Sequence, residues 1–235
     1  MAPQLTAPPP PGWWSQARQE LSAADPVLAR LIAGFGDAAL GSRGDPFTTL
    51  ARSIVGQQIS VKAAQSVWDR FAVEVARTQE ADPRKPGDQS ALMAVPPVAV
   101  TPSAVMAMNL AQLRACGLSL RKAEYLGDLA QRFDQGDLLP ERWPTMDDEA
   151  VIAELICVRG IGRWTAEMFL IFNLLRPDVL PLDDIGLLRA MGIHWLQGVT
   201  PTRAQARDLA QRWSPWRTAA TWYLWRSLDP VPVEY

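Results

Sequence analysis

Apolar residues recur at intervals of three and four along most of the chain, a spacing that places them on one face of an α-helix. Leu21, Leu28 and Ile32 follow this pattern in the first helical region. Asp45 and Pro46 are residue types that favour the N-cap and the first position of a helix, and a second run of helical spacing follows them. Because no stretch alternates convincingly between apolar and polar residues, we predict an all-α fold.

The same spacing divides the rest of the chain into further helices and connections. Ser60 can cap the helix that follows it, and one helix ends at Gly117 before another begins at about Ser119. Residues 80–103 are rich in proline and have little periodicity, so they form a connection with short helical pieces at most. The remaining predicted helices cover about 148–157, 163–175, 184–196 and 202–227.

The composition suits a globular chain with a sizeable core. The chain has 235 residues, of which 48% are hydrophobic, enough for one compact unit or two small lobes. No run approaches the length of a membrane span and no secretion signal stands at the start, so we expect a soluble, cytoplasmic protein without a membrane partner. The net charge of −2 gives no overall attraction to nucleic acid, so any such binding needs a local basic face.

Cysteine and histidine are too scarce for several kinds of site. Cys116 and Cys157 cannot supply a disulfide framework, an iron–sulfur cluster or a thiolate zinc site. His194 is the only histidine, which excludes a histidine-based metal centre and makes a packing role the better interpretation. We therefore expect no cofactor for catalysis.

The stretch "VRGIGRWTAE" breaks two apolar helical patterns with two glycines one residue apart. Gly160 and Gly162 permit backbone angles that other residues avoid, so the break predicts a helix–hairpin–helix. Backbone N–H groups and the positive N-terminal end of the second helix would favour a phosphate, with Arg159 and Arg163 beside it. The alternative is a tight turn between two helices with no ligand.

Two acidic residues follow at the head of the next predicted helix. The stretch "RPDVLPLDDIGLLRA" returns the chain to Asp183 and Asp184, the latter 22 positions after Gly162. A carboxylate at a helix N-terminus is favoured in its charged form, so Asp184 is a candidate for a fixed anion. The alternative is that either residue is only an N-cap. We interpret Asp183 as a cap or an orienting group.

Four stretches together resemble one known family. "LICVRGIGRWTAEMFLIF" followed by "LPLDDIGLLRA" is similar to the helix–hairpin–helix (HhH-GPD) DNA glycosylase superfamily, in particular to its 3-methyladenine DNA glycosylase II branch. "DPFTTLARSIVGQQISVKAAQSVWDRF" and "RWSPWRTAATWYLW" resemble the same branch. The resemblance covers roughly residues 20–227.

The resemblance implies a domain organisation. We expect two helical lobes with a DNA-binding cleft between them, preceded by a disordered, proline-rich tail over 1–12. One lobe would combine residues 13–45 with 175–235. The other would cover 46–174 and hold the helix–hairpin–helix at 149–175.

The chemistry of the family gives roles to the candidate residues. Cleavage of an N-glycosidic bond builds positive charge on the sugar, so a fixed anion and a water are needed. The resemblance gives Asp184 this catalytic role, in which it could also orient or deprotonate the water. Relatives that also nick the strand carry a lysine where this chain has Trp164, which implies a monofunctional enzyme. Trp164, Trp225 and Met168 stand at base-pocket positions, with helical core packing as the alternative for each and preferred for Met168.

The resemblance also implies contacts with DNA. An everted nucleotide leaves a gap in the duplex, and Gln58 stands at the wedge position of the loop after Gly56, with a polar connection as the alternative. The backbone carbonyls of Ile156, Val158 and Ile161 match positions that hold a monovalent cation, Na⁺ or K⁺, when DNA is bound. The complete set of implied DNA-binding residues is Gly160, Gly162, Arg159, Arg163, Thr165, Gln57 and Gln58.

These inferences combine into one functional hypothesis. The sequence indicates a monomeric, nucleoid-associated, monofunctional glycosylase of base excision repair. It would excise alkylated bases of the 3-methyladenine and 7-methylguanine type from duplex DNA by base flipping and Asp-assisted hydrolysis. The alternative is a non-catalytic DNA-binding module that uses the same hairpin, for which the glycine pattern alone would suffice.

Overall fold

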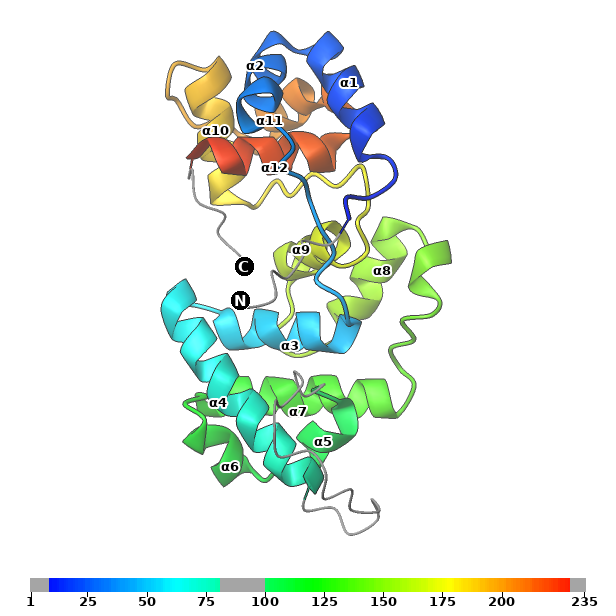
Figure 1. Ribbon diagram of the computed structural model, residues 1–235, viewed down its shortest axis with the longest axis vertical. Coiled ribbons are helices and arrows are strands. Elements are labelled where there is room, and N and C mark those ends of the chain that lie inside the picture. Colours follow the sequence, from blue (N-terminus) through cyan, green and yellow to red (C-terminus); the bar gives the residue numbers. More distant parts are fainter. Residues whose placement is uncertain (1–8, 81–99, 229–235) are drawn as a thin grey trace, which may run out of the picture. The chain divides into compact units, whose positions relative to one another are not determined.

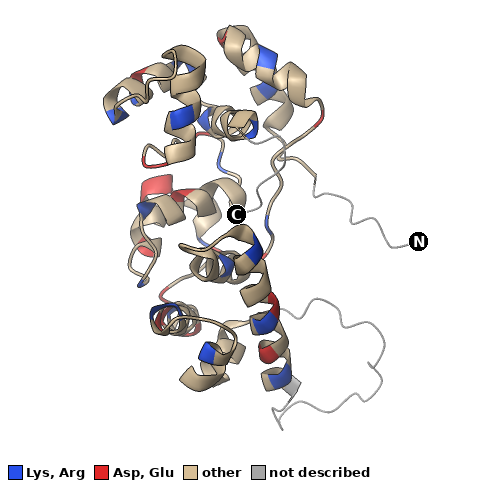
Figure 2. Cartoon of the chain, turned by 90° about the vertical axis from the view of Figure 1, so that its left-hand side faces the viewer, with Lys and Arg blue, Asp and Glu red and all other residues tan. Residues whose placement is uncertain are grey.

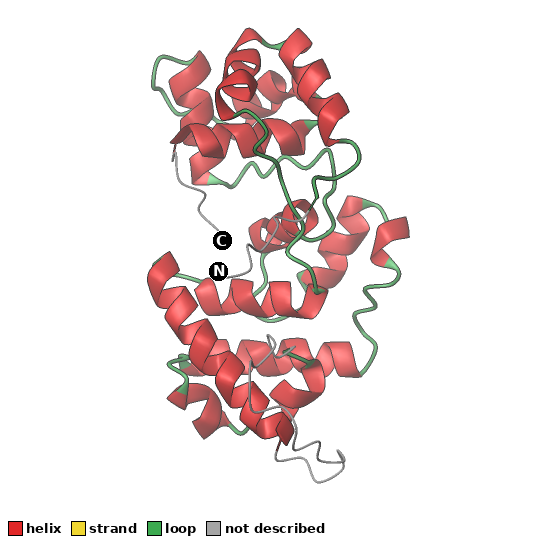
Figure 3. Cartoon of the chain, viewed as in Figure 1, coloured by secondary structure: helices red, strands yellow, loops and turns green. Residues whose placement is uncertain are grey.

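The computed structural model describes residues 9–80 and 100–228. All regular elements in these two ranges are helices, with no strand among them (Figures 1 and 3). The predicted all-α fold is confirmed. The tail over 1–8 and most of the connection after residue 80 lie outside the described residues. In chain order the helices are α1 (Trp14–Ala24), α2 (Pro26–Phe35), α3 (Pro46–Gly56), α4 (Val61–Glu80), α5 (Pro102–Ala107), α6 (Leu110–Ala115), α7 (Leu120–Asp134), η1 (Trp143–Thr145), α8 (Asp148–Leu155), α9 (Arg163–Phe172), α10 (Ile185–Trp195), α11 (Arg203–Ala210), η2 (Gln211–Trp213) and α12 (Arg217–Leu228).

The chain divides into two compact units, each with its own core. Among the described residues, the first unit combines 9–43 with 164–228, and the second combines 44–80 with 100–163. The division differs from the expected one because residues 164–174 belong with the first unit. The carbonyl of Phe172 accepts a hydrogen bond from the backbone N–H of Arg43 at 2.9 Å, which ties the end of α9 to that unit.

The first unit packs α1 against α2 and α12, and α10 against α12. Trp14 lies buried in α1 and stacks on Tyr223 of α12, with ring centroids 5.7 Å apart. Asp25 begins α2 as its N-cap and is fully buried, where its carboxylate accepts hydrogen bonds from the backbone N–H of Val27 and from the indole N–H of Trp213. Aromatic packing and a satisfied buried cap therefore hold these helices together.

The predicted single helix over 202–227 is wrong. The chain forms α11 and η2, leaves the helix at Ser214 and starts again at Arg217. Pro215 explains the break, because proline lacks a backbone N–H and forces the residue before it into an extended conformation. Ser214 has φ −65° and ψ 138°, as this restriction requires. The new start is anchored by Asp178, which accepts from Nε and Nη2 of Arg217 at 2.7 and 2.8 Å.

The second unit is built on α7, which packs against α3, α5 and α6. Asp45 caps α3 as predicted, since its carboxylate accepts from the backbone N–H of Thr48 at 2.7 Å, and Pro46 occupies the first position. The face of α3 that carries Phe47 and Leu50 is buried. Ser119 caps α7 in the same way. Apolar spacing and caps thus define these helices at the sequence level.

Basic and acidic residues are mixed on the helices of both units. Figure 2 shows lysine and arginine positions interspersed with aspartate and glutamate on the helices of both units. None of the described helices is both long and apolar enough to cross a membrane.

Candidate functional site

The hairpin between α8 and α9 requires glycine at one of its two glycine positions. Gly160 has φ +85°, a region that L-residues with side chains rarely adopt. A Cβ added there would lie 2.1 Å from Cδ2 of Tyr125, so the ring of Tyr125 packs directly against the glycine backbone. Both the backbone angle and the close packing exclude a side chain at Gly160.

Gly162 is different, although the sequence pattern treats the two glycines alike. A Cβ at Gly162 would meet no heavy atom within 4 Å, and the residue is exposed. Packing within the protein therefore does not require glycine there. The open space lies immediately before Arg163, where α9 begins and the first-turn N–H groups of a helix have no intrahelical acceptor. A ligand that approaches this backbone closely would provide a reason for the missing side chain.

Both hairpin arginines already have acidic partners that sequence reasoning missed. Arg163 makes a bidentate pair with Glu149 of α8, which lowers the pKa of the Glu149 carboxyl through the hydrogen bonds. Asp128 of α7 accepts from the backbone N–H of Arg159 at 2.9 Å, and Nε of Arg159 lies 3.5 Å from its other oxygen. Burial raises the pKa of Asp128, but hydrogen bonds from Arg159 and Arg132 outweigh it and leave the pKa below its usual value. The hairpin is thus held in shape by carboxylates.

The loop after α3 is fastened to the hairpin. Gln57, which was predicted to contact DNA, donates from Nε2 to the carbonyl of Gly160 at 2.8 Å. Lys122 donates to the carbonyl of Val55 at 2.8 Å, at the end of α3, and burial lowers its pKa. Gln58 is exposed and has φ +58°, while Ile59 beside it is 40% exposed. The loop therefore presents one polar and one apolar side chain to solvent.

The predicted cation-binding carbonyls belong to residues of different exposure. Ile156 is 48% exposed, whereas Val158 and Ile161 are buried. The carbonyl of Val158 accepts one hydrogen bond, from the N–H of Ile161 at 3.1 Å, and a carbonyl oxygen has a second lone pair. Neutral oxygen atoms of this kind fit a monovalent cation. Within 9–80 and 100–228, no three His, Cys, Asp or Glu side chains form a metal-binding cluster.

Asp184 is the N-cap of α10, and its two oxygens have different partners. Oδ1 accepts from the backbone N–H of Leu187 at 2.6 Å and from the indole N–H of Trp225 at 2.8 Å. Oδ2 accepts from the indole N–H of Trp164 at 2.9 Å. Asp184 is therefore an N-cap through Oδ1, as the alternative interpretation holds. Its second oxygen, Oδ2, is not part of the cap and faces the indole of Trp164. Three N–H donors and the N-terminus of α10 therefore surround this side chain.

The indole of Trp225 is itself held in place by an aromatic stack. Phe172 lies parallel to it, with centroids 5.8 Å apart and planes inclined by 16°. The guanidinium carbon of Arg43 lies 4.0 Å from the centroid of the Phe172 ring. These partners were missed because Arg43, Phe172 and Trp225 are far apart in the sequence, and no local pattern links them.

The remaining predicted residues of this unit differ in accessibility. Trp164 is 37% exposed and Trp225 is half-buried, so both indoles reach the surface beside Asp184. Met168 is only 6% exposed, which favours its core-packing alternative. Thr165, which the resemblance places among the DNA contacts, is buried at 7% exposure. Asp183, which the sequence offers as a cap or an orienting group, is exposed and pairs with Arg203.

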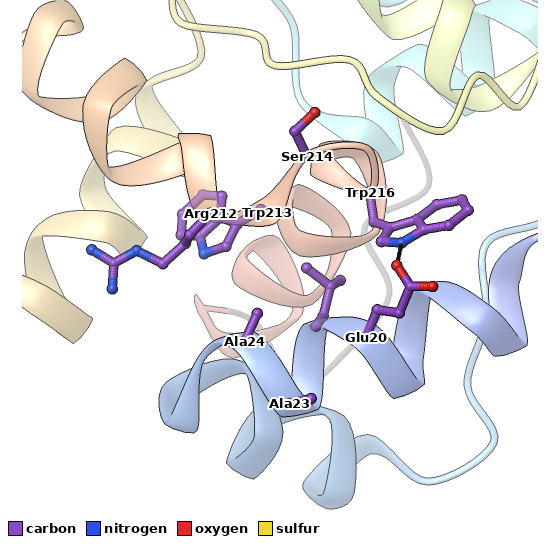
Figure 4. A pocket seen from close by; sticks show the side chains of 8 residues that line it. Glu20, Ala23, Ala24, Arg212, Trp213, Ser214 and Trp216 are labelled. Atoms are coloured by element: carbon purple, nitrogen blue, oxygen red, sulfur yellow. Dashed lines mark hydrogen bonds between the residues drawn. The ribbon is translucent and has the colours of Figure 1, made fainter.

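A separate hollow of about 380 Å³ lies in the first unit, between α1 and the segment that joins η2 to α12 (Figure 4). Trp216 donates from Nε1 to Glu20 at 2.6 Å on its wall, a hydrogen bond that lowers the pKa of Glu20. None of the site residues predicted from the sequence lines this hollow. Asp184 with its two indoles, rather than the hollow, has the chemistry of a reactive site.

Comparison with known proteins shows the family of the chain. Residues 51–215 match the family described as "HhH-GPD superfamily base excision DNA repair protein". The chain is similar to DNA-3-methyladenine glycosylase 1 of Schizosaccharomyces pombe, with 31% identity over 203 residues that span 85% of this chain and 80% of that protein. It is also similar to DNA-3-methyladenine glycosylase 2 of Escherichia coli, with 32% identity over 81% of this chain and 60% of that protein.

Solved structures show the same fold. A DNA-3-methyladenine glycosidase from Bacillus halodurans superposes with a TM-score of 0.76 and 29% identity, covering 91% of this chain and 89% of that one. The S. pombe 3-methyladenine DNA glycosylase Mag1, solved in complex with abasic DNA, superposes with a TM-score of 0.73 and 28% identity, covering 93% of this chain and all of that one.

Proposed function

The chain belongs to the HhH-GPD superfamily of base excision DNA repair proteins, on the 3-methyladenine DNA glycosylase branch, and from this premise we propose that it is a monofunctional glycosylase acting on alkylated bases. Its substrate would be duplex DNA that carries 3-methyladenine or 7-methylguanine. Its products would be the free base and an abasic site. The observation that supports this best is the carboxylate of Asp184, fixed by the indoles of Trp164 and Trp225.

Asp184 would stabilise the reacting sugar. As the bond between base and sugar breaks, positive charge develops on the sugar, and an anion that is already in place stabilises this charge without reorganisation. Oδ1 already accepts two hydrogen bonds, from Leu187 and Trp225, whereas Oδ2 accepts one, from Trp164. Oδ2 therefore keeps a lone pair for the sugar or for the attacking water. The water would add to the anomeric carbon, and its proton would pass to the carboxylate or to solvent. A base alkylated at a ring nitrogen is already cationic and leaves with little acid catalysis.

The indoles would also select the base. A cationic methylated purine stacks favourably on an electron-rich ring, by about 1–2 kcal/mol in a desolvated pocket. Trp164 is exposed enough to offer part of its ring, whereas Phe172 already covers one face of Trp225. We therefore assign the larger part of base recognition to Trp164. The same residue replaces the lysine that strand-nicking relatives use, so water is the nucleophile and the strand stays intact.

The hairpin would bind the phosphate backbone. Open space at Gly162 and the N-terminus of α9 suit close approach of an anion. The carbonyls of Ile156, Val158 and Ile161 would hold a monovalent cation, which when bound adds attraction for a DNA phosphate and takes no part in bond cleavage. Arg159 and Arg163 are already paired with Asp128 and Glu149, so they would share their charge between these carboxylates and a DNA phosphate.

Access to the bond requires the nucleotide to leave the helical stack, at a cost of a few kcal/mol. We propose that the exposed loop with Gln58 at its tip fills the resulting gap. Its attachment to the hairpin through Gln57 would hold the loop rigid during insertion. The enzyme would act as a monomer on the DNA of the nucleoid.

A product analysis tests this function. Methylated duplex DNA is incubated with the wild type and with Asp184→Asn, and released bases are separated by chromatography. The DNA is then examined for strand breaks with and without alkali. We expect the wild type to release methylated purines and to leave sites that break only in alkali, and we expect the variant to release almost none.

Other outcomes would contradict specific parts of the proposal. DNA binding without base release by either protein would indicate the non-catalytic binding module. Breaks without alkali, together with covalent trapping of the protein on DNA by borohydride, would indicate a lyase and refute the role given to Trp164.

A further inference from the structure

Gly186 lies in the first turn of α10, two residues after Asp184, and is enclosed by the site. A Cβ built on it would stand 3.1 Å from Oδ1 of Asp184 and 3.4 Å from Cδ1 of Trp225. The first distance is tighter than an ordinary contact, so Oδ1 would have to shift by a few tenths of an ångström, whereas the second is an ordinary van der Waals contact. The absence of a side chain at Gly186 therefore lets the carboxylate and the indole approach each other.

The conformation of α10 does not itself demand glycine at this position. Gly186 lies inside a helix and is not among the residues with φ in the left-handed region. Alanine is favoured over glycine in helices, because glycine loses more backbone freedom on folding. The sequence thus retains a residue that weakens the helix at a point where a Cβ would press on Asp184 and touch Trp225. This arrangement indicates a requirement of the site rather than of the fold.

The opposite side of Trp225 is enclosed as well. Phe172 covers one face of the indole, and the guanidinium of Arg43 covers Phe172 in turn. Phe172 is 8% exposed, so its ring is fixed by packing. The Trp225 indole thus lies between the Phe172 ring on one face and the backbone of Gly186 near its pyrrole edge. These two neighbours fix the position in which the indole N–H meets Oδ1 of Asp184.

We propose that Gly186 and Phe172 are positioning residues for the glycosylase reaction. They seat the Trp225 N–H on Oδ1 of Asp184 and thereby direct Oδ2 toward the reacting sugar. This inference rests on the proposed function, and neither residue needs to touch the substrate. Displacement of a reacting group by about 1 Å can cost on the order of 100-fold in rate, so a shift of a few tenths of an ångström costs roughly three- to sixfold.

The test compares Gly186→Ala with a matched control, Gly34→Ala. Gly34 also lies within a helix of the first unit, and a Cβ there would meet nothing within 4 Å. Three quantities are measured on the full chain: the melting temperature, the affinity for DNA and the single-turnover rate of base release. Proton–nitrogen NMR of the indole groups reports independently on the Trp225 N–H, assigned with Trp225→Phe. Phe172→Leu perturbs the same indole from its other face.

We expect Gly186→Ala to melt at or above the temperature of the wild type and to bind DNA equally well. Its rate should fall roughly three- to sixfold, and the Trp225 N–H resonance should move toward that of an indole in water. Phe172→Leu should move the same resonance and slow the reaction, while Gly34→Ala changes neither.

Two results would overturn the inference. One is a wild-type rate in Gly186→Ala. The other is a slower rate with the Trp225 N–H resonance unmoved, since the loss would then arise elsewhere. If the wild type releases no base, the proposed function fails by itself, and an unmoved resonance in Gly186→Ala would additionally refute the positioning.

Discussion

The two hairpin glycines should respond in opposite ways to the same substitution. In Gly160→Ala the backbone must hold φ near +85° with a side chain present, which costs about 1–2 kcal/mol. The new Cβ would also stand 2.1 Å from Cδ2 of Tyr125, and forcing a group into a packed site costs roughly 1–3 kcal/mol more. The two terms together give about 2–5 kcal/mol.

Gly162→Ala meets no such obstacle, because a Cβ there stands in open space. Reduced freedom of the unfolded chain should leave its stability equal or raise it by up to about 1 kcal/mol. Its effect should instead fall on DNA, where the methyl group would hold a phosphate away from the backbone N–H groups. Loss of a hydrogen bond to a charged group costs about 1.5–3 kcal/mol, which is at least tenfold in affinity.

Thermal unfolding and DNA titration at fixed salt separate the two effects. For a chain of this length, 1 kcal/mol shifts the melting temperature by about 2–4 °C, so Gly160→Ala should melt at least about 4 °C below the wild type. Gly162→Ala should melt within about 2 °C of the wild type or above it, and bind DNA at least tenfold more weakly. Equal melting temperatures for all three proteins, or full DNA affinity in Gly162→Ala, would refute the reasoning.

Three further predictions concern the groups around the two sites. Trp225→Phe keeps the aromatic stack but removes one donor to the carboxylate, so the single-turnover rate should fall about tenfold or more while DNA affinity is retained; an unchanged rate would exclude the hydrogen bond from the mechanism. Glu149→Gln releases Arg163 from its acidic partner and should tighten DNA binding severalfold at low salt. DNA titrations at low and high salt should show that the gain in affinity disappears at high salt, and an equal gain at both would contradict this. The pKa of Asp128 is lowered in the folded chain, so its contribution to stability is present above its ordinary value of 3.8 and is lost as the pH falls through the lowered value. Asp128→Asn should therefore be less stable than the wild type at pH 7 and lose less stability between pH 5 and pH 2, whereas parallel melting curves against pH would contradict this account.

Local chemistry made much of the fold predictable. The cap and proline at Asp45 and Pro46 fixed the start of α3, and the acidic N-cap at Asp184 fixed the start of α10. These signals act over three or four residues, and a single sequence records them fully. The extra break at Ser214 was missed because the apolar spacing continues through it, although Pro215 was the signal that could have revealed it.

Contacts between distant segments were not predictable in the same way. Asp128 and Glu149 beside the hairpin, and Arg43 and Phe172 behind the carboxylate, come from elements separated along the chain. Hydrophobic spacing places a residue on a face of its helix but does not say which other helix that face meets. Asp184 could therefore be found from its position at the start of a helix. The groups that hold it in place could be identified only from the tertiary structure.

The most direct measurement of the central claim is the single-turnover rate of methylated-base release by Asp184→Asn against its neighbour Asp183→Asn. Asparagine keeps the size and the capping oxygen of Asp184 but removes its charge, while Asp183 is exposed and pairs with Arg203. We expect Asp184→Asn to bind DNA normally and to react at least about 100-fold more slowly, with Asp183→Asn close to the wild type. A wild-type rate in Asp184→Asn would contradict the claim that this carboxylate stabilises the reacting sugar.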